Sequence, residues 1–504
     1  MTCTASVATL ERPASPTATV ETPAGPVPTT DRAGQVEQHG IDFIPAAERH
    51  GRARELFAVW AMSNVTYLYI VLGGTMILLG LNVWQAMAVI VGGNLFWALV
   101  GLLAVSGPSS GTPSGVVARS MFGVRGNRVN VAIVGWMIAV SYEAINLIVG
   151  ALAGFAFVEQ IGLTASLPVK LTIVVATAVV TLAISVYGHA TIVRVSSWFA
   201  LGLVACCAIL AVFVVQHADL HYVATDAPHG TALWAAACVG LTIIASGPLS
   251  WGSGADYARY LPETTSPRAT AAWTALGGFA PAVLLGALGV LAGTAVDMTD
   301  PQSALAAILP GWFYPVFLLA IVVGSITNNV LTAYSSGLSL QAVGVKASRA
   351  FTVFFDGVVG VSLALYALFV SNFMETVNSI LELSVSLLGP SLAIYGADII
   401  LRRNRYDGQA LHDESPSSPV WYRNGVNWCG VTAQVIGTSL ALLCVNTTIF
   451  MGPVAGALGG ADLSVLVGPV VGSACYVALT LLTRRQPATA TTAQPVVAAA
   501  AAAA

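Results

Sequence analysis

The chain has 504 residues, of which 56% are hydrophobic and only 9% charged, with a mean hydropathy of +0.79 and a formal net charge of −3. An ordinary soluble domain has about 25% charged residues, so this composition excludes a water-soluble surface and predicts an all-α membrane protein. The small net charge and the lack of a long basic run exclude a nucleic-acid partner. The seven cysteines show no metal-binding spacing, and we expect neither a metal nor a cofactor.

Both ends of the chain are typical of tails. Residues 1–40 are rich in Thr, Pro, Ala and Val, without periodicity and without the pattern of a signal peptide, which predicts a disordered cytoplasmic tail. Residues 486–504 end in an Ala run and are interpreted as a second disordered tail, with a short surface helix as the alternative. The membrane domain would then span residues 41–485.

Twelve stretches are apolar enough to cross a bilayer, whose ~30 Å core needs about 20 residues per helix. They lie roughly at residues 56–79, 84–105, 131–157, 170–187, 195–216, 232–254, 272–294, 313–343, 349–370, 376–400, 427–447 and 463–483. If both termini are cytoplasmic, every basic residue except Lys170 falls in a cytoplasmic segment. Because Lys and Arg favour cytoplasmic loops, this asymmetry supports twelve spans with both ends inside the cell.

The sixth stretch, GLTIIASGPLSWGSGADYARYLP, gathers several glycines around Pro248. Proline lacks an amide hydrogen and glycine tolerates non-helical backbone, so the pattern predicts a broken helix with free backbone groups near the midplane. A packed proline kink is the alternative. Ser250 and Trp251 follow the break and are candidate substrate contacts, the indole by stacking on a flat ring. In the corresponding first stretch, Asn64 lies in an otherwise apolar sequence and is a further candidate.

The third stretch contains SYEAINLIVG, in which Tyr142, Glu143 and Asn146 can share one helix face. A carboxylate at this depth costs ~2.5–3.5 kcal/mol on insertion scales, so Glu143 requires a polar surrounding or a proton. These three residues are candidates for substrate binding, and Glu143 also for ion coupling. Hydrogen bonding between helices is the alternative.

The eighth stretch contains VGSITNNVLTAYSSGLSL, with polar residues at spacings of three and four. The carboxamides of Asn328 and Asn329 each present a donor beside an acceptor, which matches the edge of a base such as cytosine or adenine. Polar contacts between helices are again the alternative. In the tenth stretch, Glu382 either couples an ion or packs against a partner helix. Asp356 lies near a predicted span end, where we expect it to be solvated.

Several of these segments are similar to known membrane proteins. IDFIPAAERHGRARELFAVW, SGPSSGTPSGVVARSMFGVRGN, GADYARYLP, ITNNVLTAYSSGLSLQ, LLGPSLAIYGADIILRRNRYD and GVNW spread over residues 41–447. Together they resemble the purine–cytosine permeases of the nucleobase:cation symporter-1 family. The resemblance implies twelve transmembrane helices in the inverted-repeat (5+5) transporter fold, with broken helices 1 and 6. It also implies a central site, in which Asn146 and the pair Asn328 and Asn329 match substrate-binding positions of relatives.

Three residues depart from the family pattern. Tyr142 stands where the family's stacking Trp is expected, and Leu331 where fungal members have Pro. Gly324 and Val323 occupy positions where sodium-coupled relatives present hydroxyls, although Ser325 and Thr327 would substitute if the register shifts. Valine offers no side-chain oxygen to a hard cation, so the sequence favours a proton over sodium.

The resulting hypothesis is a secondary symporter of the cytoplasmic membrane that imports a nucleobase, cytosine or a purine, together with a proton. Another small heterocycle, such as a hydantoin, allantoin or a vitamin, is the alternative substrate. An ATP-driven pump is not supported because no GxxxxGK[ST] motif is present. An enzyme is not expected either, because no catalytic Ser/His, HExxH or paired-Asp set lies at the midplane. A non-transporting sensor would usually carry a soluble signalling domain, which neither tail resembles.

Overall fold

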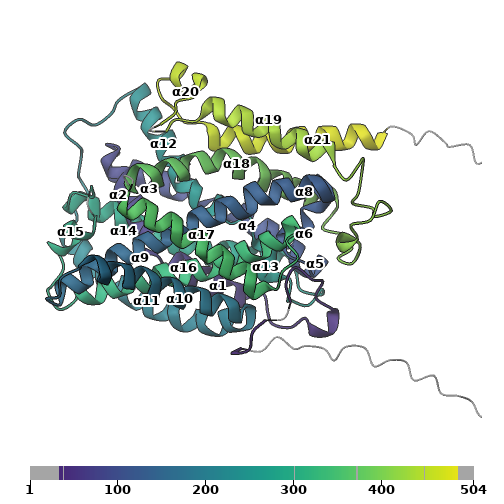
Figure 1. Cartoon of the computed structure of the whole chain (residues 1–504). Coiled ribbons are helices and arrows are strands. Elements are labelled where there is room, and N and C mark those ends of the chain that lie inside the picture. The colour runs from purple at the N-terminus through teal and green to yellow at the C-terminus, as the bar shows by residue number, and fades with distance from the viewer. Residues whose placement is uncertain (1–32, 38, 300, 371–372, 448, 486–504) are drawn as a thin grey trace, which may run out of the picture. The chain divides into compact units, whose positions relative to one another are not determined.

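The computed structural model describes residues 33–37, 39–299, 301–370, 373–447 and 449–485, without the side chains of residues 373–382 and 484–485. These residues lie in one compact unit. Within them the regular structure is helical, apart from the isolated bridges Arg423–Val426 and Asn446–Met451. The predicted all-α class is therefore confirmed for this part of the chain (Figure 1).

The helices follow the chain in an order that matches the predicted stretches. They are η1 (Ala46–Glu48), α1 (Glu55–Asn64), α2 (Tyr67–Leu78), α3 (Val83–Asn94), α4 (Trp97–Ala104), α5 (Ser106–Ser110), α6 (Ser114–Val117), α7 (Arg119–Phe122), α8 (Val124–Asn130), the π-helix η2 (Val131–Met137), α9 (Ile138–Gln160), α10 (Leu167–Tyr187), α11 (His189–His217), α12 (Thr231–Leu249), α13 (Gly254–Ala258), α14 (Pro267–Ala295), α15 (Pro301–Ala306), α16 (Tyr314–Val343), α17 (Arg349–Phe369), α18 (Phe373–Leu401), η3 (Ala410–His412), α19 (Trp428–Cys444), α20 (Pro453–Ala457) and α21 (Ser464–Arg485).

Ten segments of the described chain are long and apolar enough to cross a membrane, and α1 with α2 makes an eleventh if the bent pair counts as one span. The bend of 58° falls at Val65 and Thr66, whose backbone leaves the helical region. Helix α19 coincides with the eleventh predicted stretch and has 17 residues, near the lower limit for crossing a bilayer.

Two groups of helices enclose the centre of this unit. One group contains α1, α2, α4, α12 and α14 with α3, and the other contains α9, α10, α16 and α17. Glycines permit the close approach of α2 and α14, because a side chain at Gly73 or Gly289 would collide with backbone of the opposite helix. Helices α19 and α21 lie side by side and pack with α18 (Figure 1).

The sixth predicted stretch is interrupted in the structure. Helix α12 ends at Leu249, and α13 begins only at Gly254, so residues 250–253 are not helical. Pro248 lies inside the last turn of α12. The amides of Ser250 and Trp251 still donate to carbonyls in the last turn of α12, and the interrupted residues line the cavity described below.

Glu37, which the sequence assigned to the N-terminal tail, is buried against the helical body. Its carboxylate pairs with Arg349 at 3.1 Å and with Arg259 at 3.2 Å, and accepts hydrogen bonds from the hydroxyls of Tyr260 and Tyr334. Burial alone would raise the pKa of Glu37, but the two guanidinium groups, the hydrogen bond from Tyr260 and the nearby His189 together hold this pKa below its ordinary value. The segment before the first helix is therefore attached to α16 and α17.

Candidate functional site

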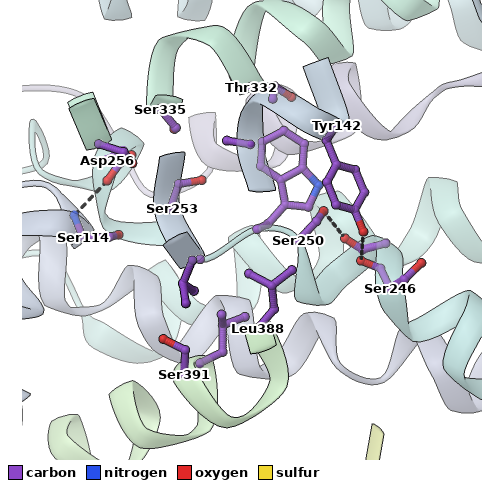
Figure 2. Close-up of a pocket in the computed structure, with 18 of the residues that line it drawn as sticks. Ser114, Tyr142, Ser246, Ser250, Ser253, Asp256, Thr332, Ser335, Leu388 and Ser391 are labelled. Carbon is purple, nitrogen blue, oxygen red and sulfur yellow. Dashed lines mark hydrogen bonds between the residues drawn. The ribbon is translucent and has the colours of Figure 1, made fainter. Parts of the chain in front are cut away.

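A central cavity lies where the two helix groups face each other. It is bounded by the start of α2, by η2 and α9, by the interruption between α12 and α13, and by α16 and α18. Figure 2 shows the polar side chains that several of these elements direct towards it, among them Tyr142, Thr332 and Ser391. Most of the polar lining consists of uncharged hydroxyls and carboxamides, which suits a neutral solute that forms hydrogen bonds.

Two carboxamides from opposite helices meet at this cavity. The amide nitrogen of Asn146 on α9 donates to the side-chain oxygen of Asn328 on α16 over 3.2 Å. Both side chains line the cavity and are almost fully buried. The bond leaves the oxygen of Asn146 and the amide nitrogen of Asn328 without a partner in the described part of the chain. Together they offer one acceptor and one donor to a solute.

Two of the predicted aromatic candidates also line the cavity. The ring of Trp251 meets Trp60 edge-on, with the ring centroids 5.3 Å apart, and is 7% exposed. The hydroxyl of Tyr142 lies 3.1 Å from the hydroxyl of Ser384 and donates to the carbonyl of Ser246 over 3.4 Å. Tyr142 and Ser246 point towards each other in Figure 2. Both rings are thus held by neighbours, as a stacking surface requires.

Ser250 and Asn64 have different relations to the cavity. Ser250 lines it, but its hydroxyl donates to the carbonyl of Gly247 over 2.7 Å. Asn64 does not line it; its oxygen accepts a 2.8 Å hydrogen bond from the hydroxyl of Tyr69, which does. Asn64 therefore holds a cavity residue in place, and any contact with a solute would come through Tyr69.

The remaining candidates lie away from the cavity or outside the described side chains. Glu143 and Asn329 are both 3% exposed, and neither lines the cavity. The side-chain oxygen of Asn329 has no hydrogen-bond partner among the described residues. The side chain of Glu382 falls outside the part of the chain that the structure describes.

Sequence reasoning missed Asp256, the one charged side chain among the described residues that line the cavity. It lies on α13 and accepts a 2.8 Å hydrogen bond from the backbone amide of Ser114, as Figure 2 shows. The hydroxyl of Ser114 in turn accepts from the amide of Ala255. The signal was present, because Asp256 stands within GADYARYLP directly after the predicted break.

The expectation that Asp356 is solvated is wrong. Its side chain is completely buried, and the indole nitrogen of Trp136 donates to it over 2.8 Å. Helix α17 begins at Arg349, so Asp356 lies two turns inside the helix and faces its neighbours. Its carboxyl interacts with that of Glu143 on α9. Burial of both acids in one place is a feature that separate motifs in the sequence do not reveal.

The described residues contain no group of three or more His, Cys, Asp or Glu side chains that could hold a metal ion. The cavity instead combines aromatic faces, the carboxamide pair and hydroxyls. Such a lining can bind a small planar heterocycle by stacking and by edge recognition.

Comparisons with known proteins agree with this geometry. Residues 43–468 match the sequence profile of the family described as "Permease for cytosine/purines, uracil, thiamine, allantoin". The chain is 28% identical over 466 residues to the "Putative purine-cytosine permease YxlA" of Bacillus subtilis, covering 88% of this chain and 96% of the relative.

Solved structures show the same fold. Mhp1, a nucleobase-cation-symport-1 family transporter in a closed conformation with bromovinylhydantoin bound, matches with a TM-score of 0.73 and 18% identity over 89% of this chain and 96% of that one. The inward-facing conformation of Mhp1 matches with a TM-score of 0.67 and 17% identity, over 89% and 95% of the two chains. At these identities the likeness concerns the fold alone.

Proposed function

The chain belongs to the family of permeases for cytosine/purines, uracil, thiamine and allantoin, and on this premise we propose that it is a secondary symporter that imports a nucleobase with a proton. It is a multi-pass membrane protein and not an enzyme. The proposed substrate is cytosine or a purine. The proposed location is the cytoplasmic membrane, with twelve spans, both termini in the cytoplasm, and broken helices 1 and 6.

The observation that carries this proposal is the pair Asn146 and Asn328, which lines the same cavity as Trp251. The oxygen of Asn146 accepts and the amide nitrogen of Asn328 donates, while their mutual 3.2 Å hydrogen bond fixes the spacing between them. Cytosine presents an exocyclic amino donor next to a ring acceptor, and so does adenine. A base whose ring stacks on the indole would place this edge against the two carboxamides, which supports a nucleobase over an aliphatic solute.

The proposed twelve spans rest on the correspondence between helices and predicted stretches. Ten segments and the bent pair α1–α2 account for eleven, and the 17-residue helix α19 supplies the twelfth. The bend at Val65 and Thr66 and the interruption after Leu249 support discontinuous first and sixth spans. All basic residues except Lys170 fall in segments predicted to be cytoplasmic, which supports the orientation.

Coupling to a proton is favoured by the surroundings of the bend in the first span. Gly324 of α16 packs next to the carbonyl of Val65 and brings no side-chain oxygen. Ser325 is turned to Gly150 of α9, away from this bend. The hydroxyl of Thr327 donates to the carbonyls of Gly324 and Met62. Among the described side chains of α16, Thr327 thus contributes one oxygen near the bend at Val65. A hard cation would need several oxygen ligands.

Uptake measurements test the proposal directly. Cells that express the chain would be given radiolabelled cytosine, adenine, guanine, hypoxanthine, uracil, allantoin and hydantoin. We expect saturable accumulation of cytosine or a purine that collapses with a protonophore and does not require sodium. Accumulation of allantoin or hydantoin alone would transfer the assignment to another heterocycle of the family. Accumulation that requires sodium and ignores the protonophore would refute proton coupling.

A further inference from the structure

Two acids meet in the interface between α9 and α17, outside the cavity. Glu143 is 3% exposed and Asp356 is not exposed at all. Gly360 lies one turn beyond Asp356 on α17, and a side-chain carbon placed there would come within 3.2 Å of the Glu143 carboxyl carbon. The glycine therefore makes room for the glutamate, and the two carboxyls face each other across the helix interface.

The described side chains around this acid pair provide hydrogen-bond donors but no counter-charge. The indole of Trp136 donates to one oxygen of Asp356 over 2.8 Å, and the buried hydroxyl of Ser336 on α16 faces the same carboxyl. One oxygen of each acid and the hydroxyl of Ser336 have no hydrogen-bond partner among the described side chains. No ion pair of either acid occurs in the described part of the chain.

The other titratable groups on the helices around the pair are directed elsewhere. On α9 and α10, Tyr142 bonds to Ser246 and lies beside Ser384, and Lys170 lies over the ring of Phe155. On α16, α17 and α18, Tyr334 and Arg349 bond to Glu37, Tyr314 bonds to Gln302, Tyr395 contacts Ser106, and Asp398 pairs with Arg402. The remaining groups are exposed, namely Glu159, Tyr187 and Tyr366. Glu375 and Glu382 of α18 belong to the side chains that the structure does not describe.

Electrostatics then limit the charge that the pair can hold. Two adjacent anions without a basic partner are strongly disfavoured in a desolvated interface. The indole of Trp136 donates to Asp356 and not to Glu143, so this hydrogen bond favours the negative charge on Asp356 and the proton on Glu143. Loss of this proton would place a second charge beside the first, and the pair would either separate or recover a proton.

The acid pair is connected to the cavity through two helices. Glu143 lies three residues before Asn146 on α9, and Ser336 lies four residues after Thr332 on α16, so each is one turn from a cavity residue. Thr332 donates to the backbone carbonyl of Asn328 over 3.2 Å. A change of charge that moves α9 against α16 and α17 would therefore change the spacing of the carboxamides of Asn146 and Asn328.

We propose that Glu143 and Asp356 form a shared-proton site, and that its protonation is coupled to the binding of the substrate by Asn146 and Asn328. The inference rests on the proposed function as a nucleobase symporter. It adds Asp356 as a coupling residue and separates the proton site from the substrate site. Protonation of the pair favours the arrangement that holds the base, and release of the base permits release of the proton.

Reconstituted vesicles with radiolabelled base allow exchange and accumulation to be measured separately. With the membrane potential clamped, one-to-one coupling to a gradient of one pH unit allows about tenfold accumulation. We expect Glu143→Gln and Asp356→Asn to exchange internal for external base but to accumulate none above the external concentration. Glu159→Gln, the same substitution at an exposed position of α9, should behave like the wild type. Normal pH-driven accumulation by both pair variants would overturn the proposal.

A second measurement uses the unsubstituted protein, in case the variants do not fold. Dicyclohexylcarbodiimide is an apolar reagent that reacts with protonated carboxyls, and peptide mass mapping locates the adduct. We expect an adduct on Glu143 that is suppressed by saturating base and by alkaline pH. No adduct on either acid at any pH would overturn the shared-proton site. By contrast, failure of the wild type to exchange any base, or accumulation driven only by sodium, would refute the proposed function itself.

Discussion

Replacement of Asn328 by alanine tests whether this side chain donates a hydrogen bond to the substrate. In the free protein the variant loses the 3.2 Å hydrogen bond with Asn146, and this loss is the same with and without substrate. The difference upon binding is the donor that Asn328 presents to the base. An acceptor of the base that is buried without a partner costs about 1–3 kcal/mol, which corresponds to a roughly 5- to 150-fold weaker affinity.

The neighbouring residue supplies the control, because Asn329 has the same side chain and does not line the cavity. Equilibrium binding of tritiated base to purified protein would be compared for Asn328→Ala, Asn329→Ala and the wild type. We expect the large loss of affinity only for Asn328→Ala, with Asn329→Ala close to the wild type. An unchanged affinity in Asn328→Ala, or a greater loss in Asn329→Ala, would show that the carboxamide pair at the cavity only connects two helices.

Three further changes have expected outcomes. Trp251→Ala should weaken base binding by about 1–3 kcal/mol through lost stacking, while Trp251→Phe should retain part of the stacking energy. Binding isotherms would measure both effects. Equal affinity in the wild type and the two variants would exclude the indole from the site. Glu37→Gln should lower the melting temperature in detergent at neutral pH, since breaking a buried ion pair costs about 3–5 kcal/mol; because its pKa is lowered in the folded state, the wild-type advantage should be lost as pH falls below about 4.5. Single cysteines placed near Arg125 or Arg405, in a background without native cysteines, should resist an impermeant thiol reagent added outside, and labelling of both in intact cells would reverse the orientation.

Most of the helical architecture was predictable because the thickness of the bilayer sets the length of the apolar stretches in the sequence. Stretches of about 20 apolar residues with basic residues between them define spans without knowledge of tertiary contacts. The interruption after Leu249 was also readable, because Pro248 and the surrounding glycines act on the local backbone. The attachment of Glu37 was not, since a single acid in a Thr- and Pro-rich segment gives no sign of the two arginines that receive it.

The site was only partly predictable, and helix rotation is the reason. Asn146, Asn328, Tyr142 and Trp251 line the cavity as the sequence suggested, since polar and aromatic residues in apolar helices tend to face protein interiors. Neighbouring residues such as Asn329 differ by about 100° in direction on a helix, and the sequence does not say which of them faces the centre.

Two buried acids of the described chain, Glu37 and Asp398, differ from Glu143 and Asp356 in one respect that bears on function. Glu37 is paired with Arg349 and Arg259, and Asp398 pairs with Arg402 at 2.9 Å while also accepting from the hydroxyls of Tyr476 and Ser120. These acids are compensated in a fixed way, which is what a structural ion pair needs. Among the described side chains, the pair of Glu143 and Asp356 has an indole and a hydroxyl around it but no cation.

In a chain with only 9% charged residues, placing two acids together without a base is costly unless a mobile charge joins them. The proton is the mobile charge that needs no further ligands, and Glu143 lies one helical turn from the carboxamide pair. A compensated acid such as Asp398 should therefore affect stability when replaced by its amide, whereas the uncompensated pair should affect coupling first. This contrast distinguishes a structural role from a transport role for acids that are equally buried.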